Sequence, residues 1–356
     1  EGDAMKGSTF SLLNLISSLK DVVKPIIIVP QEGEACKEFR SRRIQYFVVP
    51  FRLNFTERKG LERILTFIPR CFYDVFVNHI AIRSIVQIAQ EHHVDIVHSN
   101  SVVIGFGETI AKKIGAKHVW HLREFLNLDF GYNPVRGWKH LIAKINSSSA
   151  IICITNSVRS HYKLTNSQNQ YTLYNAVRPY SKVQYIEKKG NYILFCGAVT
   201  HEKGIEDALK AFSVVYNDYQ YLKLLVVGSY KKSYLSKLES VISRMGLNEV
   251  VEFLGFQIEI DEIMANALCL LMCSKNEALG RVTVEAMFNG CPVIGYAAAG
   301  TNELIQDSQN GYLYTTITEL AGKISYLIEN PDQVVPVLMR AQKFAQDNFS
   351  EEQYAD

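Results

Sequence analysis

The sequence predicts an α/β protein with two Rossmann-like, doubly wound domains that face each other across a cleft. Three observations predict this fold class. Short apolar runs alternate with amphipathic helical patterns along the chain, as in βαβ units of parallel sheets. The 356 residues exceed the roughly 100–200 residues of one typical domain. A polar segment at 179–190, with a proline at one end and a glycine at the other, interrupts the alternation and predicts a linker.

The composition is that of a globular protein, with 47% apolar and 21% charged residues. Because the net charge is only +2, nothing in the overall balance indicates a nucleic-acid partner. We see no signal peptide and no apolar run near the roughly 20 residues of a membrane-spanning helix. Seven cysteines without a CxxC pair, mostly in or beside apolar runs, predict reduced thiols that fill the core and a cytoplasmic location.

Both ends of the chain look incomplete. Residues 1–6 are polar and lead directly into a helical pattern, whereas an α/β domain usually opens with a strand. The last eight residues, FSEEQYAD, read as the start of a helix that stops early. We therefore expect further residues before and after this sequence.

The predicted first domain covers residues 1–180. An amphipathic helix at 8–19 comes first, and a second long helical pattern covers 73–92. Continuous apolar runs predict strands buried on both faces. These strands are expected at 25–30, 44–50, 94–100, 116–125, 150–155 and 172–177.

The predicted second domain covers residues 190–340, and residues 341–356 are expected to form a helix that crosses back to the first domain. The alternation restarts with an apolar run at 192–197. Further strands are predicted at 222–228 and 250–256, and helices at 204–216, 231–245 and 260–267.

Gly105 and Gly107 resemble the start of a dinucleotide-binding fingerprint. Ile110 occupies the place of the third glycine, and both glycines lie inside a helical pattern. Close helix packing is therefore the better interpretation.

Residues 37–70 combine basic and apolar side chains. The pattern indicates either a surface for an anionic membrane leaflet or an anionic acceptor, or else an ordinary solvated loop and helix face. The basic residues are Lys37, Arg40, Arg42, Arg43, Arg52, Arg58, Lys59, Arg63 and Arg70.

The most informative stretch is 269–303. It reads as strand, polar loop, helix and strand, which makes one βαβ unit with Glu277 in the loop and Glu285 in the helix. The loop lies where a parallel strand ends and a helix begins, which is where α/β sheets bind phosphorylated ligands. A helix that begins near Gly280 directs free N–H groups and partial positive charge toward such a ligand.

The two glutamates are too far apart for an acid/base couple, because helical rise alone separates them by roughly 8 Å or more. We expect them to accept hydrogen bonds from hydroxyl groups on two parts of one extended ligand. Alternatively, Glu277 caps the helix and Glu285 is a partly buried ion-pair partner. A small-residue turn at 297–300 precedes another helix near Asn302 or Glu303 and supplies further donors.

Two more segments carry candidate residues. In the loop at 196–204, glycines permit tight turns and Lys203 is placed to reach a phosphate, although a lysine before a glycine is more often merely solvated. The strand at 116–125 runs into a loop carrying His121, Arg123 and Glu124. A lone histidine is usually structural, but a position at the carboxyl end of a strand makes a functional role equally plausible.

Taken together, these motifs resemble the family 4 retaining glycosyltransferases of GT-B fold, the glycosyl transferases of group 1. The resemblance rests on WHLREF, LYNAV, the EKG at 202–204, EALGRVTVE with its Glu-x7-Glu, AGTNELI and NGYLY, in this order along the chain. It covers nearly the whole sequence, and the Glu-x7-Glu in its context is the most specific part.

The resemblance implies a nucleotide-diphosphate sugar held mostly by the second domain and an acceptor held mostly by the first. Lys203 would contact the diphosphate, Glu277 the donor-sugar hydroxyls and Glu285 the ribose, while His121 would face the reacting carbon. The implied catalytic residues are His121, Lys203 and Glu277. The implied donor-binding residues are Gly197, Lys203, Glu277, Ala278, Leu279, Gly280, Arg281 and Glu285, and the implied acceptor-binding residues are Gly7, Arg123 and Glu124.

The sequence departs from the family pattern where an arginine usually follows the glycine of the phosphate loop, because Ala198 stands there. Our hypothesis is that Arg281, beside the helix start, partly replaces it. A smaller departure is Ala176 in LYNAV, where the family often has glycine.

We therefore predict a hexosyltransferase-type enzyme that moves a sugar, with retention, to a glycan, lipid-linked or small-molecule acceptor in bacterial surface polysaccharide biosynthesis. The alternatives are a GT-B-fold sugar-nucleotide epimerase and a degenerate sugar-nucleotide-binding protein. We expect no cofactor and no metal, a UDP-sugar donor rather than a GDP-sugar, and no nucleic-acid partner. The expected location is cytoplasmic, with a possible peripheral place on the inner face of the membrane.

Overall fold

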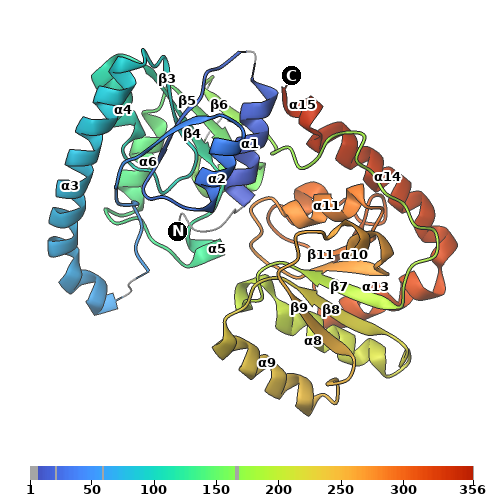
Figure 1. The fold of residues 1–356 in the computed structure, drawn as a ribbon. Helices are drawn as coiled ribbons and strands as arrows, with labels where there is room; N and C mark the ends of the chain where they lie inside the picture. The colour runs from blue at the N-terminus through green and yellow to red at the C-terminus, as the bar shows by residue number, and fades with distance from the viewer. Residues whose placement is uncertain (1–6, 21, 58–59, 165–167, 356) are drawn as a thin grey trace. The chain divides into compact units, whose positions relative to one another are not determined.

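The computed structural model describes residues 7–20, 22–57, 60–164 and 168–355, with only the backbone described for Gly7, Ser8, residues 60–71 and Ala355 (Figure 1). The chain divides into two compact units, the first ending at Asn175 and the second beginning at Ala176. The division falls a few residues before the segment whose composition predicts a linker. The domain boundaries that we expect stay a prediction.

Two parallel sheets with flanking helices make up the first unit. One pairs β1 with β2, and the other has the order β3-β4-β5-β6. Buried apolar side chains occur in β4 and β5, whereas the residues of β1 are partly buried. The elements are α1 (Gly7–Ser18), β1 (Ile26–Val29), α2 (Glu34–Ser41), β2 (Gln45–Val48), α3 (Gly60–Glu91), β3 (Ile96–Ser99), α4 (Gly107–Ile114), β4 (Lys117–Leu122), α5 (Asn127–Phe130), α6 (Trp138–Asn146), β5 (Ala150–Cys153), α7 (Asn156–His161) and β6 (Gln170–Thr172).

Two predicted boundaries in this unit are wrong. The last strand, expected at 172–177, is β6 and ends at Thr172. The long helix α3 begins at Gly60, well before the expected start at residue 73. Pro69 within its first third has no backbone N–H to donate, so sequence pattern alone argues against a helix there.

The glycines at 105 and 107 serve packing, as the sequence indicates for them. A Cβ at Gly107 would lie 2.2 Å from Ser99 Oγ and 2.6 Å from His118 Nε2. Helix α4 can therefore approach strands β3 and β4 only with glycine at this position. The helix begins at Gly107, so Gly105 precedes it rather than lying within it.

The second unit has one six-stranded parallel sheet with the order β12-β11-β10-β7-β8-β9. This is the order of a doubly wound sheet, with its switch point between β7 and β10. Figure 1 shows α11 on one side of this sheet and α8 and α9 on the other. After Ala176 come β7 (Tyr192–Cys196), the 3₁₀ turn η1 (His201–Lys203), α8 (Ile205–Tyr216), β8 (Lys223–Val227), α9 (Lys232–Arg244), β9 (Val251–Gly255), α10 (Asp261–Asn266), β10 (Cys269–Met272), α11 (Arg281–Phe288), β11 (Val293–Tyr296), α12 (Thr301–Leu304), β12 (Tyr312–Tyr314), α13 (Ile317–Glu329), α14 (Pro331–Phe349) and α15 (Glu351–Ala355).

The core of the second unit lies between this sheet and helices α8 and α13. All four residues of β10 are buried, as the continuous apolar run predicts. On α8, Leu209 and Phe212 are fully buried in the same cluster. Truncating such a leucine to alanine typically costs about 2–5 kcal/mol, so the sheet that carries the loops described below is rigid.

The segment that follows Ala176 is bonded to the second unit. The Val177 amide donates to the Phe349 carbonyl over 2.8 Å, and the Gln184 amide donates to the Phe288 carbonyl over 3.0 Å. The guanidinium of Arg178 also pairs with Asp261. Residues 177–184, which include the start of the predicted linker, are therefore bonded to the ends of α14 and α11.

Six cysteines have described side chains, and none of them forms a disulfide. Five are buried and Cys196 is partly buried, which confirms core packing for these six, while Cys71 lies outside the described side chains. In the described part of the chain, no helix combines the length and the apolar character needed to cross a bilayer.

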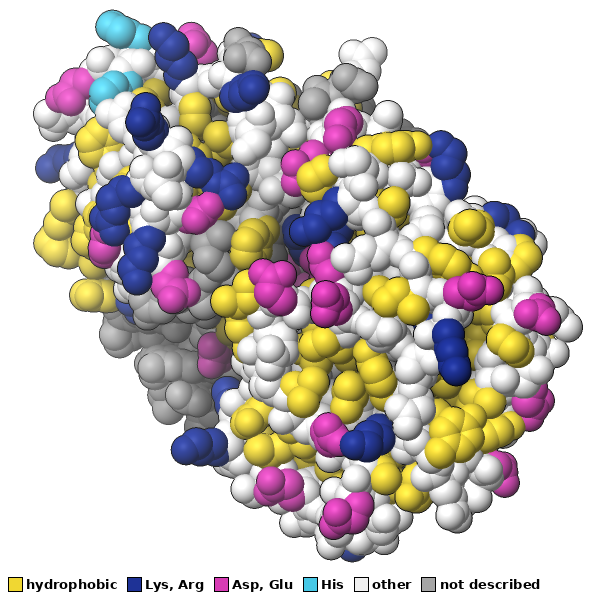
Figure 2. All heavy atoms as spheres, turned by 45° about the vertical axis from the view of Figure 1, so that its right-hand side comes forward, with side chains coloured by type: hydrophobic (Ala, Val, Ile, Leu, Met, Phe, Trp, Pro, Cys, Tyr) yellow, Lys and Arg dark blue, Asp and Glu magenta, His cyan; other side chains and the backbone are white. Residues whose placement is uncertain are grey.

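Charge is evenly distributed over the face shown in Figure 2. Lys and Arg side chains are interspersed there with Asp, Glu and hydrophobic side chains. This distribution agrees with the net charge of +2, so any binding site for a charged ligand must depend on a local group of side chains in a cavity.

Candidate functional site

A cavity of about 90 Å³ lies in the second unit, where β7 and β10 deliver their carboxyl ends. Five predicted donor-site residues from two separate sequence segments line it: Gly197, Lys203, Glu277, Gly280 and Arg281. The position matches the switch point of the sheet, where open α/β sheets bind ligands. Chain segments up to 84 residues apart therefore meet at one place, as residues 197 and 281 both line the cavity.

The loop after β7 depends on two glycines. Gly197 has φ +145° and Gly204 has φ +75°, which are backbone conformations that favour glycine. A Cβ at Gly204 would lie 2.4 Å from the Cys273 carbonyl oxygen. The close approach allows the loop carrying Lys203 to pack against the end of β10.

Lys203 and Glu277 form an ion pair across the cavity. The Lys203 Nζ lies 2.6 Å from Glu277 Oε2, and their side chains are 36% and 15% exposed. The glutamate therefore holds the ammonium at the mouth of the cavity. Since one face of the ammonium remains open to solvent, it has donors left for an anion.

The loop between β10 and α11 is bonded to the turn at Gly300, which precedes α12. The Gly300 amide donates to the Glu277 carbonyl over 2.9 Å. A Cβ at Gly300 would lie 2.5 Å from the Ala278 carbonyl oxygen, so only glycine fits. Ala278 and Leu279 are buried, and Gly280 adopts φ +81° immediately before α11. The amino end of α11 therefore lies at the cavity, which Gly280, Arg281 and Val282 line.

Arg281 and Glu285 form a second ion pair, one turn apart on α11. Arg281 Nε lies 2.9 Å from Glu285 Oε1, and Nη2 donates to the Val177 carbonyl over 3.2 Å. Glu285 lies close to Cys196, whose pKa rises to about 12, mainly through burial and secondarily through this carboxylate. The guanidinium is thus bonded to the Glu285 carboxylate and the Val177 carbonyl of its own unit, at the cavity edge. Its proposed replacement of the missing arginine at position 198 remains a hypothesis.

In the first unit, His121 lies within β4 and not in the loop that follows, so its predicted position is wrong. It is fully buried and stacks on His98 with ring centroids 5.5 Å apart. Its Nδ1 lies 3.3 Å from Arg123 Nη2. Burial, with smaller contributions from Arg123 and His98, holds the pKa of His121 well below its usual range. The imidazole is therefore neutral at physiological pH.

Arg123 and Glu124, expected to contact an acceptor, are bound inside the first unit. Arg123 is 7% exposed and its Nε donates to Asn100 Oδ1 over 2.9 Å. Glu124 accepts hydrogen bonds from the Ser101 hydroxyl and from the Val102 amide, and burial raises its pKa to about 7. Gly7, the third residue expected there, is the first residue of α1.

Among the described residues, no three His, Cys, Asp or Glu side chains lie close enough together to hold a metal ion. The cations of the site are the side chains of Lys203 and Arg281.

The comparisons with known proteins agree with this geometry. Residues 178–346, which include every residue that lines the cavity of the second unit, match the family of group 1 glycosyl transferases. An uncharacterized glycosyltransferase of Methanocaldococcus jannaschii, MJ1178, is 26% identical over 92% of this chain and 86% of its own length. The second unit matches the group 1 glycosyl transferases, and the chain is a glycosyltransferase.

Other curated relatives match this glycosyltransferase over a shorter range. The 2-deoxystreptamine glucosyltransferase of Streptomyces kanamyceticus is 29% identical over 46% of this chain and 43% of its own length. The match therefore covers less than half of that relative.

Solved structures show that the glycosyltransferase has the GT-B fold. HepE of Anabaena, solved in complex with UDP, superposes with a TM-score of 0.83 at 18% identity, covering 100% of this chain and 95% of that one. The lipopolysaccharide outer core galactosyltransferase WaaB superposes with a TM-score of 0.69 at 17% identity, covering 99% and 95%. The predicted fold class and family are confirmed.

Sequence reasoning missed two features of the glycosyltransferase's cavity. It did not single out Gly300, although the small-residue run before it indicates a tight turn. It also gave Lys203 and Glu277 separate partners, whereas the structure pairs them. The only sequence signal for such a pair is opposite charge at the ends of two strands that become neighbours once the sheet order is known.

Proposed function

We propose that this glycosyltransferase moves a sugar from a UDP-sugar to a glycan, lipid-linked or small-molecule acceptor, with retention of the anomeric configuration. The observation that carries the proposal is the meeting of Lys203, Glu277, Gly280 and Arg281 at the switch point of the second unit. A diphosphate fits a place where a lysine and the amino end of a helix converge.

The chemistry follows from where charge develops. When the bond from the sugar to the diphosphate breaks, negative charge grows on the departing phosphate while the sugar acquires positive character. Lys203 and the first-turn amides of α11 are fixed groups that stabilise this charge more in the transition state than in the ground state. Glu277 and Glu285 offer carboxylate oxygens to hydroxyls of the donor sugar and of the ribose.

His121 is assigned to the donor sugar near its reacting carbon. Because its imidazole is neutral, it can accept or donate a hydrogen bond without adding a full charge beside the cationic sugar. Its place near the carboxyl end of β4 supports this assignment.

The size of the cavity limits what it encloses. Small-molecule pockets usually measure about 300–1,000 Å³. A cavity of about 90 Å³ therefore accommodates one section of a nucleotide sugar, which we assign to the diphosphate. The base and the sugar lie outside it.

The names of structural neighbours support the donor and the pathway. HepE has been solved with UDP and with UDP-glucose, and WaaB is named for the lipopolysaccharide outer core. We therefore place the present enzyme in the synthesis of a bacterial surface polysaccharide, with UDP as the nucleotide.

We also propose a peripheral place on an anionic membrane surface. The residues between 72 and 80 of α3 expose a run of apolar side chains, with Phe72 74%, Tyr73 57%, Phe76 66% and Ile80 52% exposed. Their spacing puts them along one side of the helix. The basic residues at 58–70 belong to the same region of the sequence, but their side chains lie outside those described.

A thermal-shift panel of UDP-, GDP- and ADP-sugars tests the donor. At about 100 times its dissociation constant, a true donor stabilises the protein by roughly 2.7 kcal/mol. Stabilisation by GDP- or ADP-sugars alone would contradict the UDP assignment. Product analysis by NMR then reads the anomeric configuration, and turnover of a UDP-sugar without any acceptor would instead favour an epimerase.

A further inference from the structure

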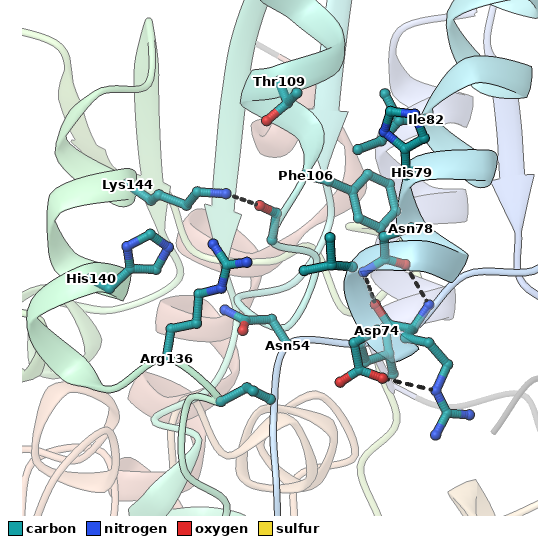
Figure 3. A pocket seen from close by; sticks show the side chains of 15 residues that line it. Asn54, Asp74, Asn78, His79, Ile82, Phe106, Thr109, Arg136, His140 and Lys144 are labelled. Carbon is teal, nitrogen blue, oxygen red and sulfur yellow. Dashed lines mark hydrogen bonds and ion pairs between the residues drawn. The ribbon is translucent and has the colours of Figure 1, made fainter. Parts of the chain in front are cut away.

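A second cavity, of about 230 Å³, lies within the first unit (Figure 3). Three segments surround it: residues 52–54 after β2, residues 105–109 at the start of α4, and residues 135–144 around α6. Residues 74–82 of α3 close the remaining side. Since 52–54 and 105–106 follow the carboxyl ends of β2 and β3, the cavity lies at the ligand-binding edge of a parallel α/β unit.

Basic side chains dominate the lining. Arg136, His140 and Lys144 are spaced four residues apart and approach the cavity from the α6 side, and Figure 3 shows Arg136 pointing toward its centre. Arg52 lies on the α3 side, where its Nε is 3.4 Å from Asp74 Oδ1. Asp74 is the only carboxylate among the described lining residues, so three cations face one anion and leave a local charge of +2 with neutral histidines.

The basic side chains in and just before α6 lie close to one another. The Lys144 Nζ donates to the Gly105 carbonyl over 2.7 Å, so its ammonium is held inside the cavity. Burial lowers the pKa of Lys144, the carboxylate of Glu108 partly offsets this shift, and Arg136 lowers the pKa further. Burial also lowers the pKa of His140, with Lys144 and Arg136 as the next causes. An anion between these groups would offset their mutual repulsion.

The remaining lining groups suit an oxyanion. Asn54 and Thr109 add polar side chains, and the first turn of α4 adds backbone amides. Because these donors come from different directions, they match a tetrahedral oxyanion better than a planar one. A cavity of this volume, below the roughly 300 Å³ of a typical small-molecule pocket, holds a charged head group rather than a whole glycan.

We propose that this cavity binds the phosphate group of a phosphate-bearing acceptor. The proposal rests on the proposed function in one respect only, namely that the bound molecule is the acceptor of the transfer. Binding of phosphate itself requires no donor and can be measured separately.

Calorimetric titration of the whole protein with inorganic phosphate, at constant low chloride concentration, tests the site. Arg136→Gln removes the exposed cation at the centre of the cavity, and Lys139→Gln is the matched control because Lys139, at the start of α6, is exposed but does not line the cavity. We expect Arg136→Gln to weaken phosphate binding at least about 10-fold and the control to leave it unchanged. The absence of phosphate binding by the unmodified protein, or equal affinity in both variants, would overturn the proposal.

Two further titrations identify the source of the phosphate. Glycerol 3-phosphate represents a soluble acceptor, and neutral phosphatidylcholine vesicles with and without phosphatidic acid represent a lipid head group. In either case the response must be lost in Arg136→Gln and kept in Lys139→Gln. A vesicle response without a glycerol 3-phosphate response assigns a lipid phosphate, and the reverse assigns a soluble one.

The same variants separate this proposal from the proposed function. If phosphate binding is lost in Arg136→Gln while no sugar nucleotide binds to any variant, the anion site stands and the transferase assignment fails. If a UDP-sugar binds and is turned over but Arg136→Gln binds phosphate as tightly as the unmodified protein does, the transferase assignment stands and the anion site fails.

Discussion

Replacing Lys203 by alanine tests the donor site most directly. The change removes the ammonium that lies 2.6 Å from Glu277 Oε2 and leaves the glutamate at the cavity without its partner. Lys275→Ala is the matched control. That lysine lies in the loop after β10, is 58% exposed and sits 3.6 Å from Asp207, outside the cavity.

The expected effect on binding is much larger than the effect on stability. An ion pair with a lysine exposed to this extent contributes only about 0.2–1 kcal/mol to folding, because solvent screens it. A hydrogen bond to a charged phosphate contributes about 1.5–3 kcal/mol, which corresponds to a roughly 10–150-fold loss of affinity for a UDP-sugar. Turnover should fall further, since the charge on the leaving diphosphate grows in the transition state.

Three measurements check this reasoning on both variants: chemical unfolding, calorimetric titration with UDP and with a UDP-sugar, and the rate of UDP release. We expect Lys203→Ala to unfold within about 1 kcal/mol of the unmodified protein but to bind both ligands weakly. If it bound them within about twofold of Lys275→Ala, the assignment of Lys203 to the diphosphate would be refuted.

Three further predictions follow from single contacts. Gly300→Ala should lower the free energy of unfolding by about 1–3 kcal/mol and weaken donor binding, because the new Cβ would lie 2.5 Å from the Ala278 carbonyl oxygen. Gly322→Ala is the control for the unfolding measurements. A Cβ there would have no atom within 4 Å, so this variant should not be destabilised. Arg281→Ala should weaken donor binding if Arg281 replaces the missing arginine, and unchanged affinity and turnover would refute that replacement. Because burial raises the pKa of Glu124 to about 7, the stability that its protonated form contributes is fully present below about pH 4.5 and is lost as the pH rises through 7. The free energy of unfolding, measured at several pH values, should therefore fall by at most about 3 kcal/mol over this range. Glu124→Gln should not show this fall.

The fold was largely predictable because the local signals agree with the final structure. In the second unit, the apolar runs predict β7, β8 and β9 to within one residue, since each run is continuous and apolar and each helix between them has one apolar side. The exceptions are places where local signals conflict with the structure. Pro69 argues against the first third of α3, and the apolar residues after Thr172 pack without joining a strand.

The site was predictable only as separate motifs. Lys203 and Glu277 each follow a strand, and the sequence places both at the carboxyl edge of a sheet. Their pairing depends on β7 and β10 being neighbours, which no local pattern specifies. The cavity of the first unit, which we propose binds phosphate, was also predictable only in part. The four-residue spacing of Arg136, His140 and Lys144 indicates that they share one side of a helical segment, but no local pattern predicts that Arg52 lies beside them.

The two glutamates of the second unit have a different role from that of a glycosidase pair. Each is bonded to a cation, Glu277 to Lys203 and Glu285 to Arg281. A carboxylate held in this way fixes its partner's position before any substrate arrives, so little reorganisation is needed when charge develops on a leaving group. The same carboxylates retain lone pairs for substrate hydroxyls, because an ionised carboxylate accepts about four hydrogen bonds. Under the proposed function, Glu277 and Glu285 therefore orient the cations and hold the donor at the same time.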